Sequence, residues 1–358
     1  MVCFIFIVTL LIAVPMQAFS EPTQVESATN IVSDTVQEKE DLEAEAKTKN
    51  KPDPVAVAPP IGKFPATLVH LGETDVFSPY AFIVDKSTRT LSVWKYKDKK
   101  LSPVASYPSD MGRKLGDKKV LGDLKTPEGI YFFQTAYKGG QLDFNEYGSR
   151  AFAMDYPNFF DLLDQKTGSG IWLHAIPETK SLLRGSRGCV IVRDKVINKV
   201  HEFITLKKTP IVIQNQVQYI NHEEHKSNML TLTNWVHGWR KSWQSKDINS
   251  YISYYGEQFK ALNMNRKQWR KYKENLNSQY TTISVEISEP MIMVHADEAV
   301  VKFLQAYQSN QKSDFGEKIL YLKKDNTTQF RIIGEKWTAV PKKNITAGKF
   351  SDPNDSSL

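Results

Sequence analysis

The chain has 358 residues, which is too long for one ordinary domain and suits two. Hydrophobic residues make up 41% of it and charged residues 24%, a composition that is ordinary for a soluble globular protein and sufficient to bury a core. The formal net charge of +7 is unevenly spread, because residues 21–50 hold eight acidic and three basic side chains, which leaves +12 for residues 51–358. The positive charge of residues 51–358 favours binding to an anionic partner or surface. The alternative is that this charge serves only to keep the protein soluble.

The first twenty residues have the pattern of an export signal. Residues 2–14 form an apolar run interrupted only by Thr9, and small residues follow at Ala18 and Ser20. We therefore expect a signal peptide over residues 1–20, although no Lys or Arg precedes the run. If it is not cleaved, the same segment is expected to tether the chain to the membrane. Export to the periplasm or cell envelope makes nucleic acid an unsuitable partner and favours the carboxylate-rich cell wall or an anionic membrane surface.

Export also makes the cysteine count informative. The chain has two cysteines, Cys3 and Cys189, and cleavage of the signal would leave only Cys189. A single cysteine forms no internal disulfide, so a free thiol would enter an oxidising compartment. Such a thiol is expected to be buried, paired with another chain, or used.

Two segments follow the signal in the first part of the chain. Residues 21–60, rich in Glu, Lys, Ala, Thr and Ser, are expected to form a disordered linker, because they hold too little apolar surface to offset their ordering entropy. Residues 61–216 are expected to form a mainly β domain. Its short strands are predicted at residues 81–84, 91–96, 130–133, 171–174, 189–192 and 210–213, with a helix at residues 195–206.

The second half has an α+β layout. A polar stretch at residues 221–228 is expected to separate the two domains, of which the second spans residues 226–342 and is followed by a flexible tail, residues 343–358. Helical spacing predicts a first helix carrying Leu232, Trp235, Trp239 and Trp243, and a second one that Asp247 caps and that carries Tyr251, Tyr255 and Phe259. Strands are predicted at residues 283–287, 291–295, 300–303, 319–321 and 330–332.

The residues that carry chemistry are His174 and the segment Ser186–Arg187–Gly188–Cys189. A thiol enzyme needs a partly exposed cysteine in an electropositive place, an imidazole within hydrogen-bond reach, and backbone N–H groups aimed at the developing oxyanion. Gly188 permits close backbone approach, and Arg187 adds positive charge. The alternatives are that Cys189 is a small buried side chain at a strand start and that His174 is a core histidine. A metal site is not expected, because no third ligand lies nearby in the sequence.

This His174-to-Cys189 pattern resembles the catalytic domain of the L,D-transpeptidase (YkuD/ErfK-type) family, in its YafK-like branch. Residues 122–131 and 168–174 match further segments of that domain, and the resemblance covers residues 61–216. The second half resembles, by pattern only, a nuclear transport factor 2-like (SnoaL-like) domain. Together they are similar to the L,D-carboxypeptidases that set cell shape. The resemblance implies a β-sandwich or barrel with short helices, followed by an α+β domain.

The resemblance also implies a mechanism without a cofactor. Cys189 would be the nucleophile and His174 the general base, with the Ala175 carbonyl orienting the imidazole. The N–H groups of Gly188 and Cys189 are candidates for the oxyanion hole, within a motif that includes Ser186 and Arg187. The reaction would be acyl transfer on peptidoglycan tetrapeptide stems, breaking the L,D bond before the terminal D-alanine.

Two departures from the family pattern concern the substrate contacts. Ala175 stands where the family usually has Gly, and Ile191 stands where it often has Arg or Asn. Arg193 is the nearest basic residue, so Arg193 and Trp172 are the candidates for substrate binding. Three alternatives stay open: a transpeptidase outcome, a carboxypeptidase outcome, and a non-catalytic exported scaffold that binds peptidoglycan. The second domain would either help to hold the ligand or mediate packing, including homodimer formation.

Overall fold

The computed structural model describes residues 51–341 except 73, 75 and 76, together with residues 39, 43, 46 and 47. The expected signal peptide, most of the expected linker and the expected tail lie outside the described residues. The chain divides into two compact units, Met1–Glu43 and Ala44–Leu358, and all the elements below belong to the second unit.

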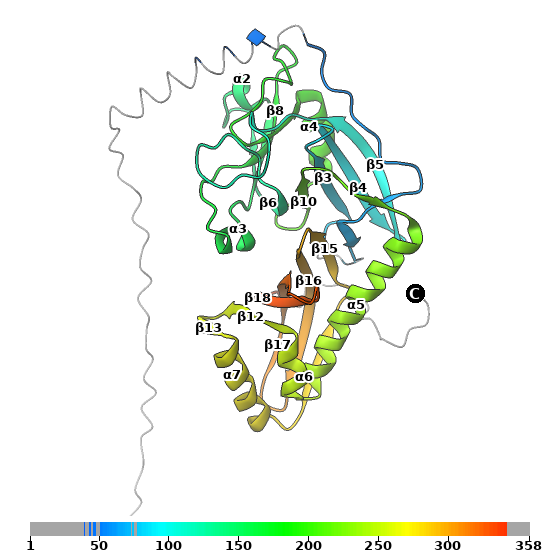
Figure 1. The fold of residues 1–358 in the computed structure, drawn as a ribbon, viewed down its shortest axis with the longest axis vertical. Helices are drawn as coiled ribbons and strands as arrows, with labels where there is room; N and C mark the ends of the chain where they lie inside the picture. Colours follow the sequence, from blue (N-terminus) through cyan, green and yellow to red (C-terminus); the bar gives the residue numbers. More distant parts are fainter. Residues whose placement is uncertain are drawn as a thin grey trace, which may run out of the picture. The chain divides into compact units, whose positions relative to one another are not determined.

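An eight-stranded sheet forms most of the first half, in the order β5-β4-β3-β10-β6-β7-β8-β9 (Figure 1). Its strands are β3 (Tyr80–Asp85), β4 (Thr90–Lys97), β5 (Lys100–Pro108), β6 (Gly129–Lys138), β7 (Arg150–Met154), β8 (Trp172–Ile176), β9 (Val190–Arg193) and β10 (Pro210–Gln214). Its short helices are α2 (Phe144–Tyr147), α3 (Phe159–Leu163), α4 (Asp194–Val200) and the 3-10 helix η1 (His201–Phe203). This agrees with the expectation of a mainly β domain with short helices.

The local sequence explains the first hairpin. Asp85 ends β3, and its Oδ1 accepts hydrogen bonds from the backbone N–H groups of Ser87 and Thr88, which turns the chain back into β4. The apolar run of β3 is buried on both faces of the sheet, since its alternate residues belong to two different core clusters. The predicted hairpin is therefore present.

The two ends of this sheet approach each other just after β5. Asp110 and Ile191 of β9 exchange both backbone hydrogen bonds, with N···O distances of 2.8 and 2.7 Å. The Asp110 side chain is completely buried, forms an ion pair with Arg89, and accepts a 2.7 Å bond from the backbone N–H of Gly185. Asp110 thus joins β5, β9 and the connection that leads to Cys189, and gives the sheet a barrel-like closure.

The second half is a sheet with helices, as the pattern predicted. Seven strands follow the order β13-β12-β18-β17-β16-β15-β2, and β14 also pairs with β16 (Figure 1). The strands are β2 (Leu68–His70), β12 (Tyr255–Ala261), β13 (Met264–Asn265), β14 (Ile283–Ile287), β15 (Met291–His295), β16 (Glu298–Ser309), β17 (Ser313–Lys324) and β18 (Phe330–Ala339). The helices are α5 (His222–Gln244), α6 (Ile248–Ser253) and α7 (Arg266–Gln279), and a small sheet pairs β1 (Phe64–Pro65) with β11 (Tyr219–Ile220). Residues 64–70, expected within the first domain, therefore pair with strands of the second half.

The helical predictions are partly right. Helix α5 buries Leu232, Val236, Trp239 and Trp243, whose spacing of three and four residues forms one apolar stripe. The polar stretch at residues 221–228 is no separator, because Asn221 caps α5 and the following residues form its first turns.

The second helix is shorter than predicted. Asp247 caps α6 as expected, through bonds to the N–H groups of Asn249 and Ser250, but the helix ends at Ser253. Tyr255 and Phe259 lie on strand β12, where positions four residues apart face the same side of the sheet, and their rings pack 4.8 Å apart in the core. A four-residue step satisfies both helix and strand geometry, so the spacing alone did not distinguish them.

The end of the expected linker is bound to the first sheet. Val57 N–H donates a 3.0 Å hydrogen bond to Thr90 Oγ1, and Asp53 forms an ion pair with Arg193. Residues 51–60 are thus held in place, contrary to the expected disorder.

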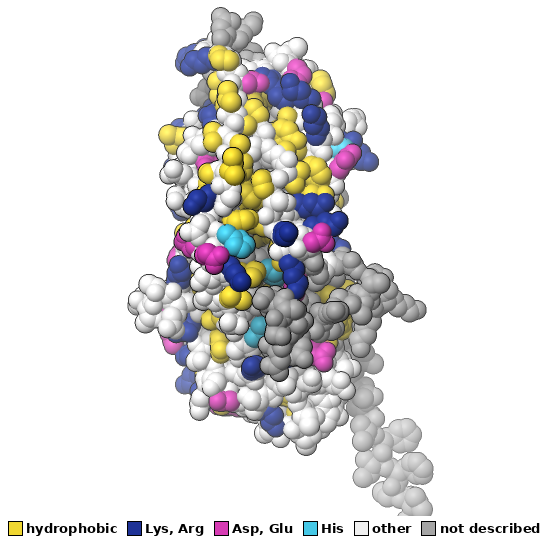
Figure 2. Space-filling model, turned by 90° about the vertical axis from the view of Figure 1, so that its right-hand side faces the viewer, with side chains coloured by type: hydrophobic (Ala, Val, Ile, Leu, Met, Phe, Trp, Pro, Cys, Tyr) yellow, Lys and Arg dark blue, Asp and Glu magenta, His cyan; other side chains and the backbone are white. Residues whose placement is uncertain are grey.

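Figure 2, which faces the β5 side, shows a band of hydrophobic side chains flanked by Lys and Arg over this half of the molecule. Across the described part of the chain, no helix has both the length and the apolarity of a membrane span.

We predict that Asp110→Ala lowers the free energy of unfolding by at least about 2 kcal/mol, because it leaves buried N–H donors and Arg89 without their acceptor. Urea unfolding of the full chain measures the change. The exposed Glu202, changed to Ala, is the control and should alter stability by less than about 0.5 kcal/mol. An equal change in both variants would contradict the role given to Asp110.

Candidate active site

The register of β8 and β9 determines where His174 and Cys189 lie. The two strands are parallel, with Leu173 opposite Val190 and His174 opposite Ile191, and Cys189 immediately precedes β9. Side chains alternate between the two faces of a sheet, and register partners share a face. Cys189 and His174 therefore project from the same face, one register step of two residues apart along neighbouring strands.

His174 is held in one orientation. Its ring is 3% exposed, and Nδ1 lies 2.8 Å from the carbonyl oxygen of Ala175. A carbonyl only accepts, so Nδ1 carries the hydrogen and Nε2 is the basic nitrogen of the neutral ring. Burial lowers the pKa of His174 to about 4, and the charge of Arg184 lowers it further. The hydrogen bond to Ala175 and the charge of Glu146 raise the pKa and partly offset this decrease.

The turn of residues 186–189, here called the Cys turn, is held by Ser186. Its buried hydroxyl accepts a 2.9 Å hydrogen bond from Gly188 N–H and donates a 2.7 Å bond to the carbonyl oxygen of Cys189. Gly188 has φ +138°, and a Cβ there would lie 2.7 Å from the carbonyl oxygen of Lys125. Only glycine fits this position without strain.

The surroundings of Cys189 favour the neutral thiol. Its side chain is partly exposed, and Sγ–H donates to the carbonyl oxygen of Gly170 at 3.5 Å. Desolvation by the surrounding residues raises the pKa of Cys189 to about 11. The Trp172 N–H and three cations lower the pKa, but by less than desolvation raises it. These cations are Arg187, Arg184 and Lys118. The raised pKa of the thiol and the lowered pKa of the His174 imidazole both favour the uncharged form of the group.

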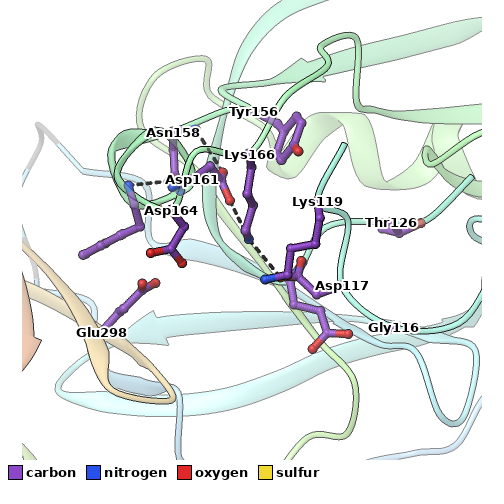
Figure 3. A network of polar contacts seen from close by, with 12 residues as sticks. Gly116, Asp117, Lys119, Thr126, Tyr156, Asn158, Asp161, Asp164, Lys166 and Glu298 are labelled. Atoms are coloured by element: carbon purple, nitrogen blue, oxygen red, sulfur yellow. Dashed lines mark hydrogen bonds and ion pairs between the residues drawn. The ribbon is translucent and has the colours of Figure 1, made fainter. Parts of the chain in front are cut away.

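Polar contacts fix the loop of residues 114–128, which borders the Cys turn and supplies the Lys125 carbonyl. Lys166 Nζ lies 2.8 Å from Asp161 Oδ1 and 2.9 Å from Asp117 Oδ2, and Figure 3 shows its amine between the two carboxylates. Burial would lower the pKa of Lys166, but the hydrogen bond and charge of Asp161 raise it well above its usual value. Lys166 is therefore a permanent cation that ties this loop to α3.

Two predicted site residues have other partners in the structure. The Gly188 N–H is bonded to Ser186, which leaves the Cys189 N–H as the candidate oxyanion donor; it has no hydrogen-bond partner in the described part of the chain. The Arg193 guanidinium is 9% exposed and donates to Asp53 and to the carbonyl oxygens of Pro177, Glu178 and Lys180. Its donors are already engaged, so Arg193 positions a loop and does not suit a substrate contact.

The motif residue Arg187 and the substrate candidate Trp172 are both at least partly accessible to solvent. Arg187 is exposed, whereas Trp172 is half-buried and stacks on Tyr137 with ring centroids 4.9 Å apart. Tyr147 of α2 contacts both Trp172, at 5.3 Å, and the edge of His174, at 5.2 Å. Sequence reasoning missed both tyrosines and also Asp110, because they come from other elements and no spacing rule links them to the motif. In the described residues, no three His, Cys, Asp or Glu side chains converge as metal ligands.

Comparison with known proteins agrees with this geometry. Residues 79–213 match the model of the YkuD L,D-transpeptidase catalytic domain, and residues 231–336 match the Cds6 C-terminal NTF2-like domain. The structure of Bd1075 from Bdellovibrio bacteriovorus is 42% identical, with 78% of this chain and 99% of that chain covered and a TM-score of 0.73. The chain belongs to the YkuD L,D-transpeptidase family.

A second solved relative has the same two-domain extent. The helical cell shape determining protein Pgp2 from Campylobacter jejuni is 27% identical, with 75% of this chain and 95% of that chain covered and a TM-score of 0.59. A search of the curated proteins found no match. Membership of the YkuD family associates the domain of residues 79–213 with peptidoglycan chemistry of the L,D-transpeptidase type.

We predict that Cys189 of the free protein reacts slowly with iodoacetamide at neutral pH and about tenfold faster with each pH unit up to pH 10. A thiol with a pKa of about 11 is ionised in only roughly one molecule in ten thousand at pH 7. Mass spectrometry of a Cys3→Ser variant measures this rate, with the urea-unfolded chain, whose rate levels off near pH 9, as the control. A rate already maximal at pH 7 would indicate a thiolate–imidazolium pair and contradict the neutral one.

Gly188→Ala is expected to destabilise the protein by about 1–3 kcal/mol, since the new Cβ meets the Lys125 carbonyl in a strained backbone region. Gly140→Ala is the matched control, because Gly140 also has positive φ but has nothing within 4 Å of an added Cβ. Thermal unfolding compares the two. Equal losses would mean that the backbone angle, and not the contact with the loop, makes Gly188 necessary.

Proposed function

We propose that the chain is an exported cysteine enzyme that breaks the L,D bond before the terminal D-alanine of peptidoglycan tetrapeptide stems. The observation that carries this proposal is the pairing of β8 with β9. It brings His174, with Nε2 free to act as a base, to the same face as Cys189 in a chain of the L,D-transpeptidase family. We infer the reaction class from membership of the family, and the roles of His174 and Cys189 from the geometry of the site.

The proposed reaction begins with a coupled proton transfer. Cys189 Sγ attacks the carbonyl carbon at the L-centre of the third stem residue while its proton moves to His174 Nε2, because neither group is charged beforehand. The oxyanion accepts a hydrogen bond from the Cys189 N–H. When the tetrahedral species collapses, the carbon–nitrogen bond breaks, Nε2 returns the proton to the amine of D-alanine, and a thioester remains on Cys189.

The thioester has two possible acceptors. With water, Nε2 takes a proton from the attacking molecule, the thiol reforms, and a tripeptide stem is released. With the amine of a second stem, the same steps give a direct cross-link. Hydrolysis is our proposal, by analogy with the relatives that share the C-terminal NTF2-like domain.

A role in cell shape is part of the proposal. Pgp2, to which the chain is similar over 75% of its length, is described as a determinant of helical cell shape. Trimming stems to tripeptides removes donors for cross-linking, which is a direct route from this chemistry to wall curvature. The periplasm is the proposed location, since the substrate lies there and residues 1–20 have the pattern of an export signal.

We predict that Cys189→Ala abolishes release of D-alanine from purified tetrapeptide muropeptides, with a loss of at least about a thousandfold, because no other group can form the thioester. The melting temperature should stay within a few degrees, since the partly exposed thiol adds little packing. Chromatography of the products measures turnover and separates tripeptides from cross-linked dimers.

The matched control is Cys3→Ser, which removes the other thiol and should keep full turnover. Retained turnover in Cys189→Ala would rule out the nucleophile assigned here. A wild-type chain that binds peptidoglycan but releases no D-alanine would instead support the non-catalytic scaffold.

A further inference from the structure

Arg184 is a buried cation beside the catalytic pair that the steps above leave without a role. It lies five residues before Cys189, on the connection between β8 and β9, and is 8% exposed. Its Nε is buried and has no hydrogen-bond partner among the residues that the structure describes. An unsatisfied buried donor of this kind costs free energy and is often retained where a ligand supplies the acceptor.

Helix α2 links Arg184 to His174. Arg184 contacts Glu146 of this helix, and the ring of the next residue, Tyr147, lies 5.2 Å from the His174 ring. The charge of Arg184 also contributes to the lowered pKa of His174 and opposes the rise in the pKa of Cys189. Its nearest acid is Glu146, whose Oε2 is 3.7 Å from Nη2, too far for a hydrogen bond. Glu146 is itself 41% exposed and also contacts Lys180 at 3.3 Å, so it only partly neutralises the guanidinium.

The segment that carries Arg184 is held at both ends. On one side, Gly185 N–H donates to the buried Asp110 carboxylate at 2.7 Å. On the other side, Arg193 donates to the carbonyl oxygens of Pro177 and Lys180. Arg184 is therefore presented by a fixed backbone, as a binding residue needs to be.

The substrate of the proposed function has one anion at the right place. The carboxylate of the terminal D-alanine is separated from the scissile nitrogen by a single carbon atom. Arg184 contacts Glu146, whose chain neighbour Tyr147 lies 5.2 Å from the His174 ring, so we place this carboxylate next to Arg184. A guanidinium also binds a carboxylate through two parallel N–H bonds, of which the unpartnered Nε–H would be one.

We propose that Arg184 binds the free carboxylate of the departing residue and so limits cleavage to stems that end one residue after the scissile bond. This role rests on the proposed function. It gives the chain a carboxylate contact although Ile191 stands where the family often has Arg or Asn, and although Arg193 is engaged elsewhere. Glu146 would then keep its contact with Lys180 when the substrate displaces it from Arg184.

The experiment compares two substrates, a tetrapeptide stem with a free terminal carboxylate and the same stem with a C-terminal amide. The wild-type chain should cleave the free acid at least tenfold better in kcat/KM, mainly through a lower KM. In Arg184→Gln the two substrates should differ by less than about threefold, because only the acid loses a partner. Arg184→Lys should restore part of the preference. Arg150→Gln, at a half-buried arginine bonded to Asn198, should keep the wild-type ratio.

Each outcome has a distinct meaning. Equal cleavage of acid and amide by the wild-type chain overturns the role of Arg184 and leaves the proposed function intact. An Arg184→Gln variant that loses activity equally on both substrates assigns Arg184 to stabilising the site and also overturns it. If that variant does not fold, the wild-type and Arg184→Lys ratios decide the matter. No release of D-alanine from either substrate overturns the function together with this inference.

Discussion

The buried Asp110 connects the fold of the first domain to its chemistry. Its backbone pairs with Ile191 of β9, which brings the two ends of the sheet together, and its carboxylate holds Arg89 and the N–H of Gly185. The strand that follows Cys189 and the segment that precedes the Cys turn are thereby attached to the same residue. A buried carboxylate with several charge-assisted bonds is stable only when all its partners are in place, so the closure of the sheet and the position of the thiol form together.

Burial also decides the protonation state of the site. An exposed thiol beside three cations would have a depressed pKa, yet desolvation outweighs those charges at Cys189 and also keeps the His174 ring neutral. In the proposed mechanism, Cys189 would therefore stay unreactive until a substrate binds, because charge separation becomes favourable only when an oxyanion forms next to its N–H. If the chain is exported as proposed, a neutral thiol is also the less easily oxidised form in an oxidising compartment.

The C-terminal NTF2-like domain is built around its aromatic residues, as the pattern indicated. Trp239 and Trp243 of α5 pack on Phe303 and Tyr307 of β16, which fastens the helix to the sheet. Lys273 of α7 is only 7% exposed, and its amine lies 4.1 Å from the Trp243 ring. Burial lowers the pKa of Lys273 to about 7. Its amine lies over aromatic ring faces, an arrangement that the sequence of α7 alone does not indicate.

The amino-acid sequence alone determined the two-domain organisation, the strand segments of the first sheet, the apolar stripe of α5 and the likeness of the His174–Cys189 pattern to a thiol enzyme. These are local properties, set by residue type and by periods of two and three to four residues. The tertiary structure decided what depends on residues distant in the chain. These features are the shared face of His174 and Cys189, the burial that shifts the pKa of each, the engagement of Arg193 by Asp53, and the burial of Arg184 with an unpartnered Nε. Such contacts arise from strand register and from the desolvation of particular side chains, and no local pattern encodes either of them.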